Sequence, residues 1–133
     1  MSTTKDRRYV AVLRTAGLAL LPWIAVLALT LRDPAGWVAL DVAEALALLG
    51  TARLLRTGHR LHRPVAALAA LLLVADAGCD LGTATVGADT LSALAMALLA
   101  ELPLALLCGH LVLRATGRAS RAVTARPRLA LAA

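Results

Sequence analysis

The chain has 133 residues, of which 60% are hydrophobic and 17% are charged, and its net charge is +6. A soluble domain of this length would carry more charged surface, so the composition excludes an ordinary soluble protein and predicts one membrane-embedded domain. Nucleic acid is excluded as a partner, because the basic residues flank apolar segments instead of forming a binding face. Two tryptophans and one tyrosine also leave little to stack on bases or on a hydrophobic carbocation.

Four apolar segments follow one another, each long enough to cross about 30 Å of hydrocarbon. They are predicted at about 9–31, 36–55, 64–87 and 90–113. Pro64 suits the first turn of the third helix, and Thr90 suits the N-cap of the fourth. The first segment is interpreted as a retained span, because it is long for a signal peptide and no small-x-small cleavage site follows it. The predicted fold class is all-α, a four-helix transmembrane bundle over 9–114, between a basic N-terminus (1–8) and a tail (115–133).

The basic residues predict the direction of the spans. Of the 14 Lys and Arg residues, all but Arg32 lie in the N-terminal flank, the middle loop or the C-terminal flank. Because cytoplasmic loops are enriched in Lys and Arg, this pattern predicts a multi-pass protein of the plasma (inner) membrane with both termini cytoplasmic. The Arg-rich middle loop and the tail, which is expected to be disordered, are predicted to contact anionic lipid head groups.

Carboxylates inside the apolar segments are the most unusual feature of the sequence. Asp41 and Glu44 are spaced i, i+3, and Asp76 and Asp80 are spaced i, i+4, so each pair shares one helix face. With Glu101 of the fourth span, a rise of about 1.5 Å per residue puts all of them in one slab between the bilayer centre and its outer edge. A bare carboxylate is unfavourable at that depth, so these groups should face the protein interior and be protonated, paired or bound to a cation.

Basic partners are scarce at this depth. Arg14, Arg53 and His110 are expected nearer the inner leaflet. Arg32 is expected at the outer rim, beside Asp33. The leading hypothesis is therefore that the five carboxylates bind protons or a cation, for transport or for sensing. Four short helices are few for a monomeric transporter, so a homo-oligomer or a partner membrane subunit is expected.

Two alternatives stay open from the sequence. Protonated carboxylates can form hydrogen bonds between helices, which would suit a structural or accessory membrane subunit. An intramembrane metal-dependent enzyme ranks last, because no histidine is expected to reach the acidic slab and no nucleophile is evident. The sequence holds no P-loop, dinucleotide fingerprint or zincin motif, so no catalytic residue is predicted, and no cofactor apart from a bound cation.

Small residues and prolines predict two further features of the spans. Gly78 and Gly82 form a G-x-x-x-G pattern on the side of the third span opposite its aspartates, where span one or a second copy of the protein can approach closely. Pro103 cannot donate a hydrogen bond to the carbonyl of Leu99, which frees an acceptor close to Glu101.

Three acidic stretches carry a resemblance to a known family. They are LDVAEAL at 40–46, DAGCD at 76–80 and ELPLA at 101–105. Over about 36–114 the chain resembles a family of small four-span membrane proteins from actinobacteria, in which these three acidic patterns occur together. Relatives carry two aromatic residues between the aspartates, where this chain has Gly78 and Cys79. The resemblance implies that the carboxylates act as one unit, and it implies no particular activity.

Overall fold

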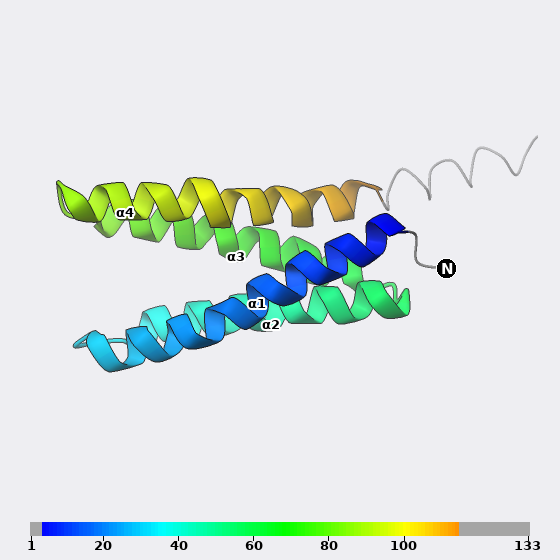
Figure 1. Cartoon of the computed structure of the whole chain (residues 1–133), viewed down its shortest axis with the longest axis horizontal. Helices are drawn as coiled ribbons and strands as arrows, with labels where there is room; N and C mark the ends of the chain where they lie inside the picture. Colours follow the sequence, from blue (N-terminus) through cyan, green and yellow to red (C-terminus); the bar gives the residue numbers. More distant parts are fainter. Residues whose placement is uncertain (1–3, 115–133) are drawn as a thin grey trace, which may run out of the picture.

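The computed structural model describes residues 4–114, apart from the side chains at 88 and 89. The helices run in the order α1 (Thr4–Thr30), α2 (Ala35–Thr57), α3 (His62–Thr83) and α4 (Ala88–Met96), and α4 passes into the π-helical turn η1 (Ala97–Glu101). After η1 the chain stays helical through 102–114. Successive helices run antiparallel along one common direction, and α1 with α2 and α3 with α4 form two hairpins (Figure 1). The predicted all-α class is confirmed.

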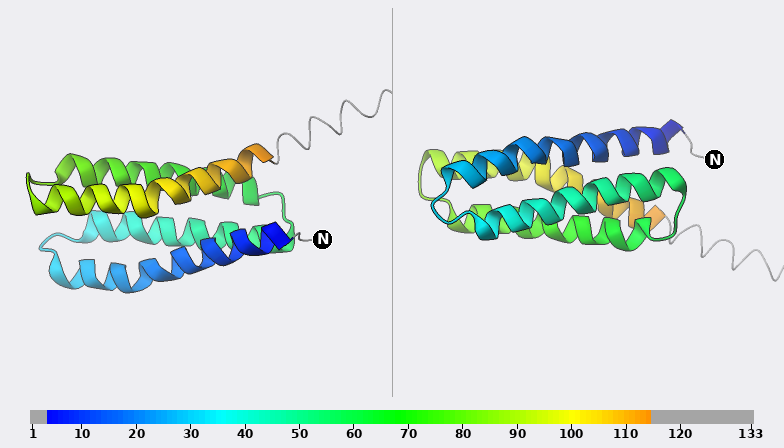
Figure 2. Two further views of the ribbon diagram at one scale, coloured as in Figure 1. Left: turned by 45° about the horizontal axis from the view of Figure 1, so that its top comes forward. Right: turned by 90° about the horizontal axis from the view of Figure 1, so that it is seen from below.

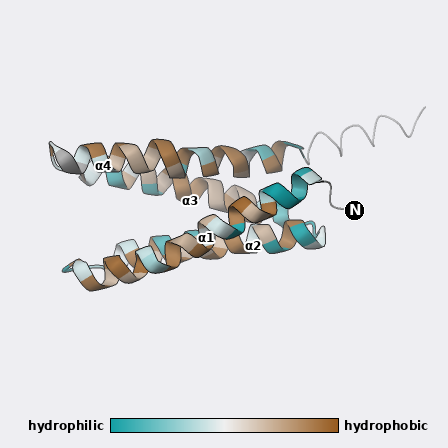
Figure 3. Ribbon diagram, in the orientation of Figure 1, coloured by the Kyte–Doolittle hydropathy of each residue, from teal (hydrophilic) through white to brown (hydrophobic). Residues whose placement is uncertain are grey.

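Three of the helical segments have the length and apolar composition of a membrane span, and these are Thr4–Thr30, His62–Thr83 and Thr90–Arg114. The chain is accordingly a multi-span helical membrane protein. α2 is not among the three, and it carries both Asp41 and Glu44 on its buried side. Leucines such as Leu29, Leu71 and Leu99 point outward, as expected of a surface that faces acyl chains. Hydrophobic residues cover much of each helix, and hydrophilic ones gather toward the helix ends (Figure 3).

α1 starts at Thr4, earlier than the predicted span, because the polar residues before Tyr9 continue the same helix. Asp6 lies in the first turn, where a negative charge complements the positive end of the helix dipole. α2 ends at Gly58, whose φ of 68° is left-handed and whose N–H donates to Leu55 O at 3.2 Å. Glycine is the usual residue at this position because it has no side chain to strain the turn. The predicted basic tail, 115–133, lies outside the described residues.

α1 and α2 pack closely at Gly17. A Cβ added at Gly17 would lie 2.8 Å from the Cγ of Leu49 and 3.3 Å from the carbonyl oxygen of Ala45. Added at Gly78 or Gly82, it would meet nothing within 4 Å. The G-x-x-x-G face of α3 is therefore not packed against span one or any other described part of this chain, and its use by a second copy stays a prediction.

α1 and α4 meet at one end of the bundle and separate toward the other. The rings of Tyr9 and His110 lie 6.3 Å apart, and the guanidinium carbon of Arg114 lies 5.6 Å from the Tyr9 ring centroid. From this end, where α1 contacts the helical segment 102–114, α1 diverges from α4 (Figure 1), and Figure 2 shows the antiparallel course of the helices from two further sides. The closely packed neighbours are α1 with α2, α2 with α3 and α3 with α4. The separation leaves room for the cavity described next.

Candidate functional site

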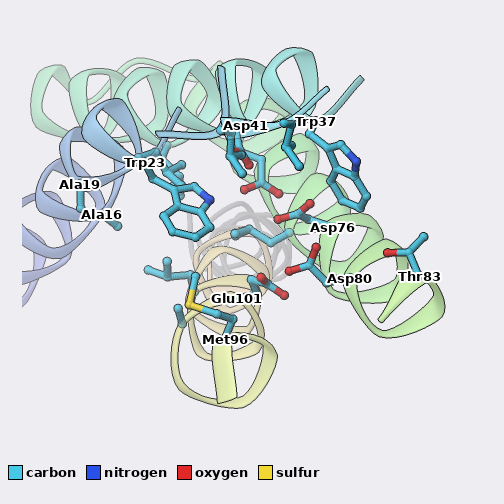
Figure 4. Close-up of a pocket in the computed structure, with 18 residues that line it drawn as sticks. Ala16, Ala19, Trp23, Trp37, Asp41, Asp76, Asp80, Thr83, Met96 and Glu101 are labelled. Carbon is cyan, nitrogen blue, oxygen red and sulfur yellow. The ribbon is translucent and has the colours of Figure 1, made fainter. Parts of the chain in front are cut away.

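The five carboxylates predicted to share one slab converge in the structure. One oxygen each from Asp41, Glu44 and Asp76 lie within 4.8 Å of one another. The same holds for one oxygen each from Asp76, Asp80 and Glu101. Three elements thus contribute to one cluster, called here the carboxylate site: α2 with two residues, α3 with two, and η1 with one. Figure 4 shows the side chains of Asp41, Asp76, Asp80 and Glu101 pointing toward one another.

Three members of the carboxylate site are buried and incompletely hydrogen-bonded. Asp41 is 4% exposed, Glu44 is 1% exposed and Glu101 is 5% exposed. One carboxylate oxygen in each of them is buried and has no hydrogen-bond partner. Buried polar atoms in proteins nearly always have a partner, and leaving one without costs about 1–3 kcal/mol. A bound proton or ligand would therefore stabilise these three oxygens.

Charge compensation from basic residues is missing at the site. Within 4–114, no basic side chain forms an ion pair with any of the five. Arg14, Arg53 and Arg56 line a separate pocket of about 270 Å³ between α1 and α2. None of the five carboxylates lines that pocket.

A cavity of about 720 Å³ adjoins the carboxylate site. All four helices contribute to its walls. The side chains from α1 are small or apolar: Ala16, Ala19, Leu20, Trp23 and Leu27, with Leu31 just after the helix. All five carboxylates lie in the walls formed by α2, α3 and η1. The α1 wall therefore carries no charged side chain, and the carboxylates lie in the other walls together with apolar side chains such as Leu48 and Leu73.

The π-helical turn η1 brings Glu101 to the cavity. The N–H of Leu102 donates to the carbonyl of Ala97, five residues earlier, as π-helical geometry requires. Pro103 follows directly, and a proline in an α-helix would press its ring against the carbonyl four residues before it, here that of Leu99. The sequence predicted the freed acceptor but not the bulge. Single π-turns are frequent at functional sites, and Pro103 beside Glu101 was the available signal.

Both tryptophans of the chain line the cavity. Their rings lie on either side of the carboxylates in Figure 4. Three aromatic residues in the sequence predict little stacking on a hydrophobic carbocation, and neither tryptophan is predicted at the site from the sequence. A signal existed for Trp37, which precedes Asp41 by four residues and so lies on the same face of α2. Thr83 also lines the cavity, and its hydroxyl donates to the Cys79 carbonyl at 2.8 Å.

The cavity walls contain none of the three histidines of the chain, which are His59, His62 and His110, and no cysteine. Its ligand atoms are carboxylate oxygens, which suit hard cations and ammonium groups better than zinc or copper.

Comparison of the chain with protein-family models, with curated proteins and with solved structures gives no match.

Proposed function

We propose that the protein binds a cation, in competition with protons, at the carboxylate site inside the membrane, as a step in transport or sensing. The observation that carries this proposal is the set of three buried carboxylate oxygens without partners, on Asp41, Glu44 and Glu101. Each of these three residues also contributes one carboxylate oxygen to a group of three that lie within 4.8 Å of one another. Hard cations bind oxygen ligands at about 2.3–2.6 Å, so oxygens on opposite sides of one ion lie about 5 Å apart.

The arrangement in the membrane is part of the proposal. α2 has 23 residues, or roughly 34 Å of helix, and packs between α1 and α3. We take it as a fourth span, whose carboxylates face the cavity and not the lipid. The distribution of Lys and Arg supports cytoplasmic termini in the plasma (inner) membrane. On this basis, and on its three acidic patterns, we group the chain with the actinobacterial four-span family.

The alternative of structural hydrogen bonding fits the carboxylate site less well. Carboxylates that hold helices together should be protonated and bonded to one another or to backbone carbonyls. No backbone or side-chain N–H or hydroxyl group within 4–114 donates to three of these buried oxygens. A cluster that is complete only with a ligand supports binding.

Protons and a cation compete for the same oxygens. A protonated carboxyl group is neutral and loses most of its attraction for a cation. Binding of a cation therefore releases protons, and a rise in proton concentration releases the cation. Such linked exchange allows a proton gradient to drive transport, or allows the occupancy of the site to report pH.

The exposed glycine face supports the expectation of a partner. Gly78 and Gly82 leave open space on the outer side of α3, where another transmembrane helix can lie close to the backbone. We propose that a second copy or a partner membrane subunit occupies it.

The test is thermal stability of the purified protein in lipid nanodiscs, across pH and a panel of inorganic and alkylammonium cations. A ligand that binds only the folded state at 100 times its Kd stabilises by about 2.7 kcal/mol. We expect at least one cation to stabilise the protein, less so at lower pH. Asp76→Asn with Glu101→Gln should abolish the effect, because amides keep the shape of the acids but not their charge.

The control is Asp33→Asn, which removes an exposed carboxylate from the loop between α1 and α2. It should respond to cations like the wild type. A wild type indifferent to every cation and to pH, with amide variants indistinguishable from it, would overturn the proposal and leave the acids a structural role.

A further inference from the structure

We infer that the cation is organic: an amphiphilic ammonium whose charged head lies among the carboxylates and whose apolar part lies along α1. The inference rests on the proposed cation site and adds the chemical class of its ligand. The observations that carry it are the size of the cavity, the division of its walls, and its two indole rings.

Size is the first argument. The cavity measures about 720 Å³, within the range of about 300–1,000 Å³ that is typical of pockets for drug-sized ligands. A bare inorganic ion held by three carboxylates would fill only a small part of it. Apolar cavity walls hold water poorly, because water needs two to four polar partners. The remaining volume beside α1 is therefore suited to hydrocarbon.

The division of the walls is the second argument. On the α1 side, the side chains of Leu20, Leu27 and Leu31 offer no charge and no hydrogen-bonding group. On the opposite side lie five carboxylates, with no basic residue among the cavity-lining side chains. A ligand complementary to both sides has a cationic end and an apolar end. Neither a metal ion nor an uncharged lipid chain meets both conditions.

The indole rings supply the third argument. Trp23 and Trp37 flank the carboxylates, and Trp23 is 44% exposed, although it is one of the largest apolar side chains in the chain (Figure 4). An ammonium over the face of a tryptophan is attracted by the ring, most strongly when water is excluded. Carboxylates and indoles together are a characteristic environment for substituted ammonium groups, which carry charge and hydrocarbon on the same atom.

An amphiphile also has a way to reach the cavity. α1 and α4 are not closely packed where the cavity lies, since their ring contacts are at the other end of the bundle. Leu27 of α1 and Met96 of α4 both belong to the cavity wall. Passage between these two helices leads directly from the hydrocarbon of the bilayer, where such ligands partition.

The test uses the two tryptophans as reporters, since both line the cavity and the chain has no others. The protein in nanodiscs of uncharged lipid is titrated with 4-phenylbutyltrimethylammonium, and tryptophan fluorescence and thermal stability are recorded. The matched probe is its uncharged analogue, in which a tert-butyl group replaces the trimethylammonium group. Sodium, magnesium and calcium are titrated separately. Titration of the Asp76→Asn, Glu101→Gln variant measures the signal that remains when two of the five carboxylates are replaced by amides.

We expect saturable binding of the charged probe only, lost in the amide variant. Trp23→Leu, which leaves Trp37 as reporter, should weaken binding roughly 2- to 30-fold. Leu27→Ala should weaken it as well, whereas Leu29→Ala, on the outward surface of α1, should not. Circular dichroism checks that each variant is folded.

The other outcomes separate this inference from the proposed function. Stabilisation by an inorganic cation without binding of the organic one would overturn the inference and leave the proposed function standing. Equal binding of the charged and uncharged probes would also overturn it, because the cavity would then be an apolar pocket of the kind that a lipid chain fills. No response to any cation or to pH would overturn both.

Discussion

The guanidinium carbon of Arg114 lies 5.6 Å from the centroid of the Tyr9 ring, which joins the end of the fourth helix to the first. The His110 ring adds a tilted contact at 6.3 Å. At this end α1 meets the helical segment 102–114 that follows η1, and α1 and α4 diverge toward the other end (Figure 1). Leu27 of α1 and Met96 of α4 line the cavity beside the carboxylate site. The contact therefore determines where α1 is anchored relative to the cavity.

A double-mutant cycle measures this contact. Tyr9→Leu keeps an apolar side chain but removes the ring face, and Arg114→Gln removes the charge. We expect a coupling free energy of about 0.5–1 kcal/mol between the two changes, since a cation–π pair near the membrane surface stays partly hydrated. The measurement is unfolding of the four proteins of the cycle in the same lipid. Additive effects would mean that the two side chains are neighbours without interacting.

Topology is tested by cysteine labelling in intact cells. In a background with Cys79→Ala and Cys108→Ala, a cysteine is placed at Asp33 or at His59, in two exposed loops. We expect an impermeant maleimide to label position 33 from outside, and position 59 only after permeabilisation. Labelling at position 59 in intact cells would contradict cytoplasmic placement of the middle loop.

The π-helical turn predicts a selective effect of Pro103→Ala. Alanine restores an N–H and removes the ring that opposes α-helical geometry. We expect regular helix to replace η1, with stability unchanged or increased, while Glu101 turns away from the other carboxylates. Cation-dependent stabilisation should then fall severalfold. Pro22→Ala is the control, because Pro22 also lies inside a helix but does not line the cavity. Equal effects of the two variants would show that the bulge does not position Glu101.

Replacement of glycine by leucine should affect stability differently at positions 17 and 78. Gly17→Leu places a side chain where a Cβ alone already meets Leu49 at 2.8 Å, so it should separate α1 from α2 and destabilise by about 1–3 kcal/mol. Gly78→Leu meets nothing within 4 Å and should leave the stability of one subunit unchanged. Unfolding and size-exclusion chromatography distinguish the effects. A shift of oligomeric state in Gly78→Leu alone would assign the α3 glycine face to subunit contact.

The helices and the convergence of the five carboxylates could both be predicted from the sequence, and one property of the helix explains why. A helix rises by a constant amount per residue, so spacing along the chain converts directly into depth and face. The roles of Gly17 and Gly78 depend instead on which helices become neighbours. The G-x-x-x-G pattern indicated Gly78 and Gly82 as packing glycines, whereas within this chain Gly17 is the closely packed one. The turn at η1 depends on how the helix accommodates Pro103, since a kink and a bulge are both available to it. Trp23 borders the cavity only because α1 leans away from α4.

Asp76 supplies an oxygen to both groups of three in the carboxylate site. The two groups are therefore linked, because a cation held with Asp41 and Glu44 lies close to the group that contains Asp80 and Glu101. The positive charge of one bound cation should weaken the binding of a second. Movement of a cation between the two groups would carry its charge from the α2 side to the α4 side while one carboxylate holds it throughout.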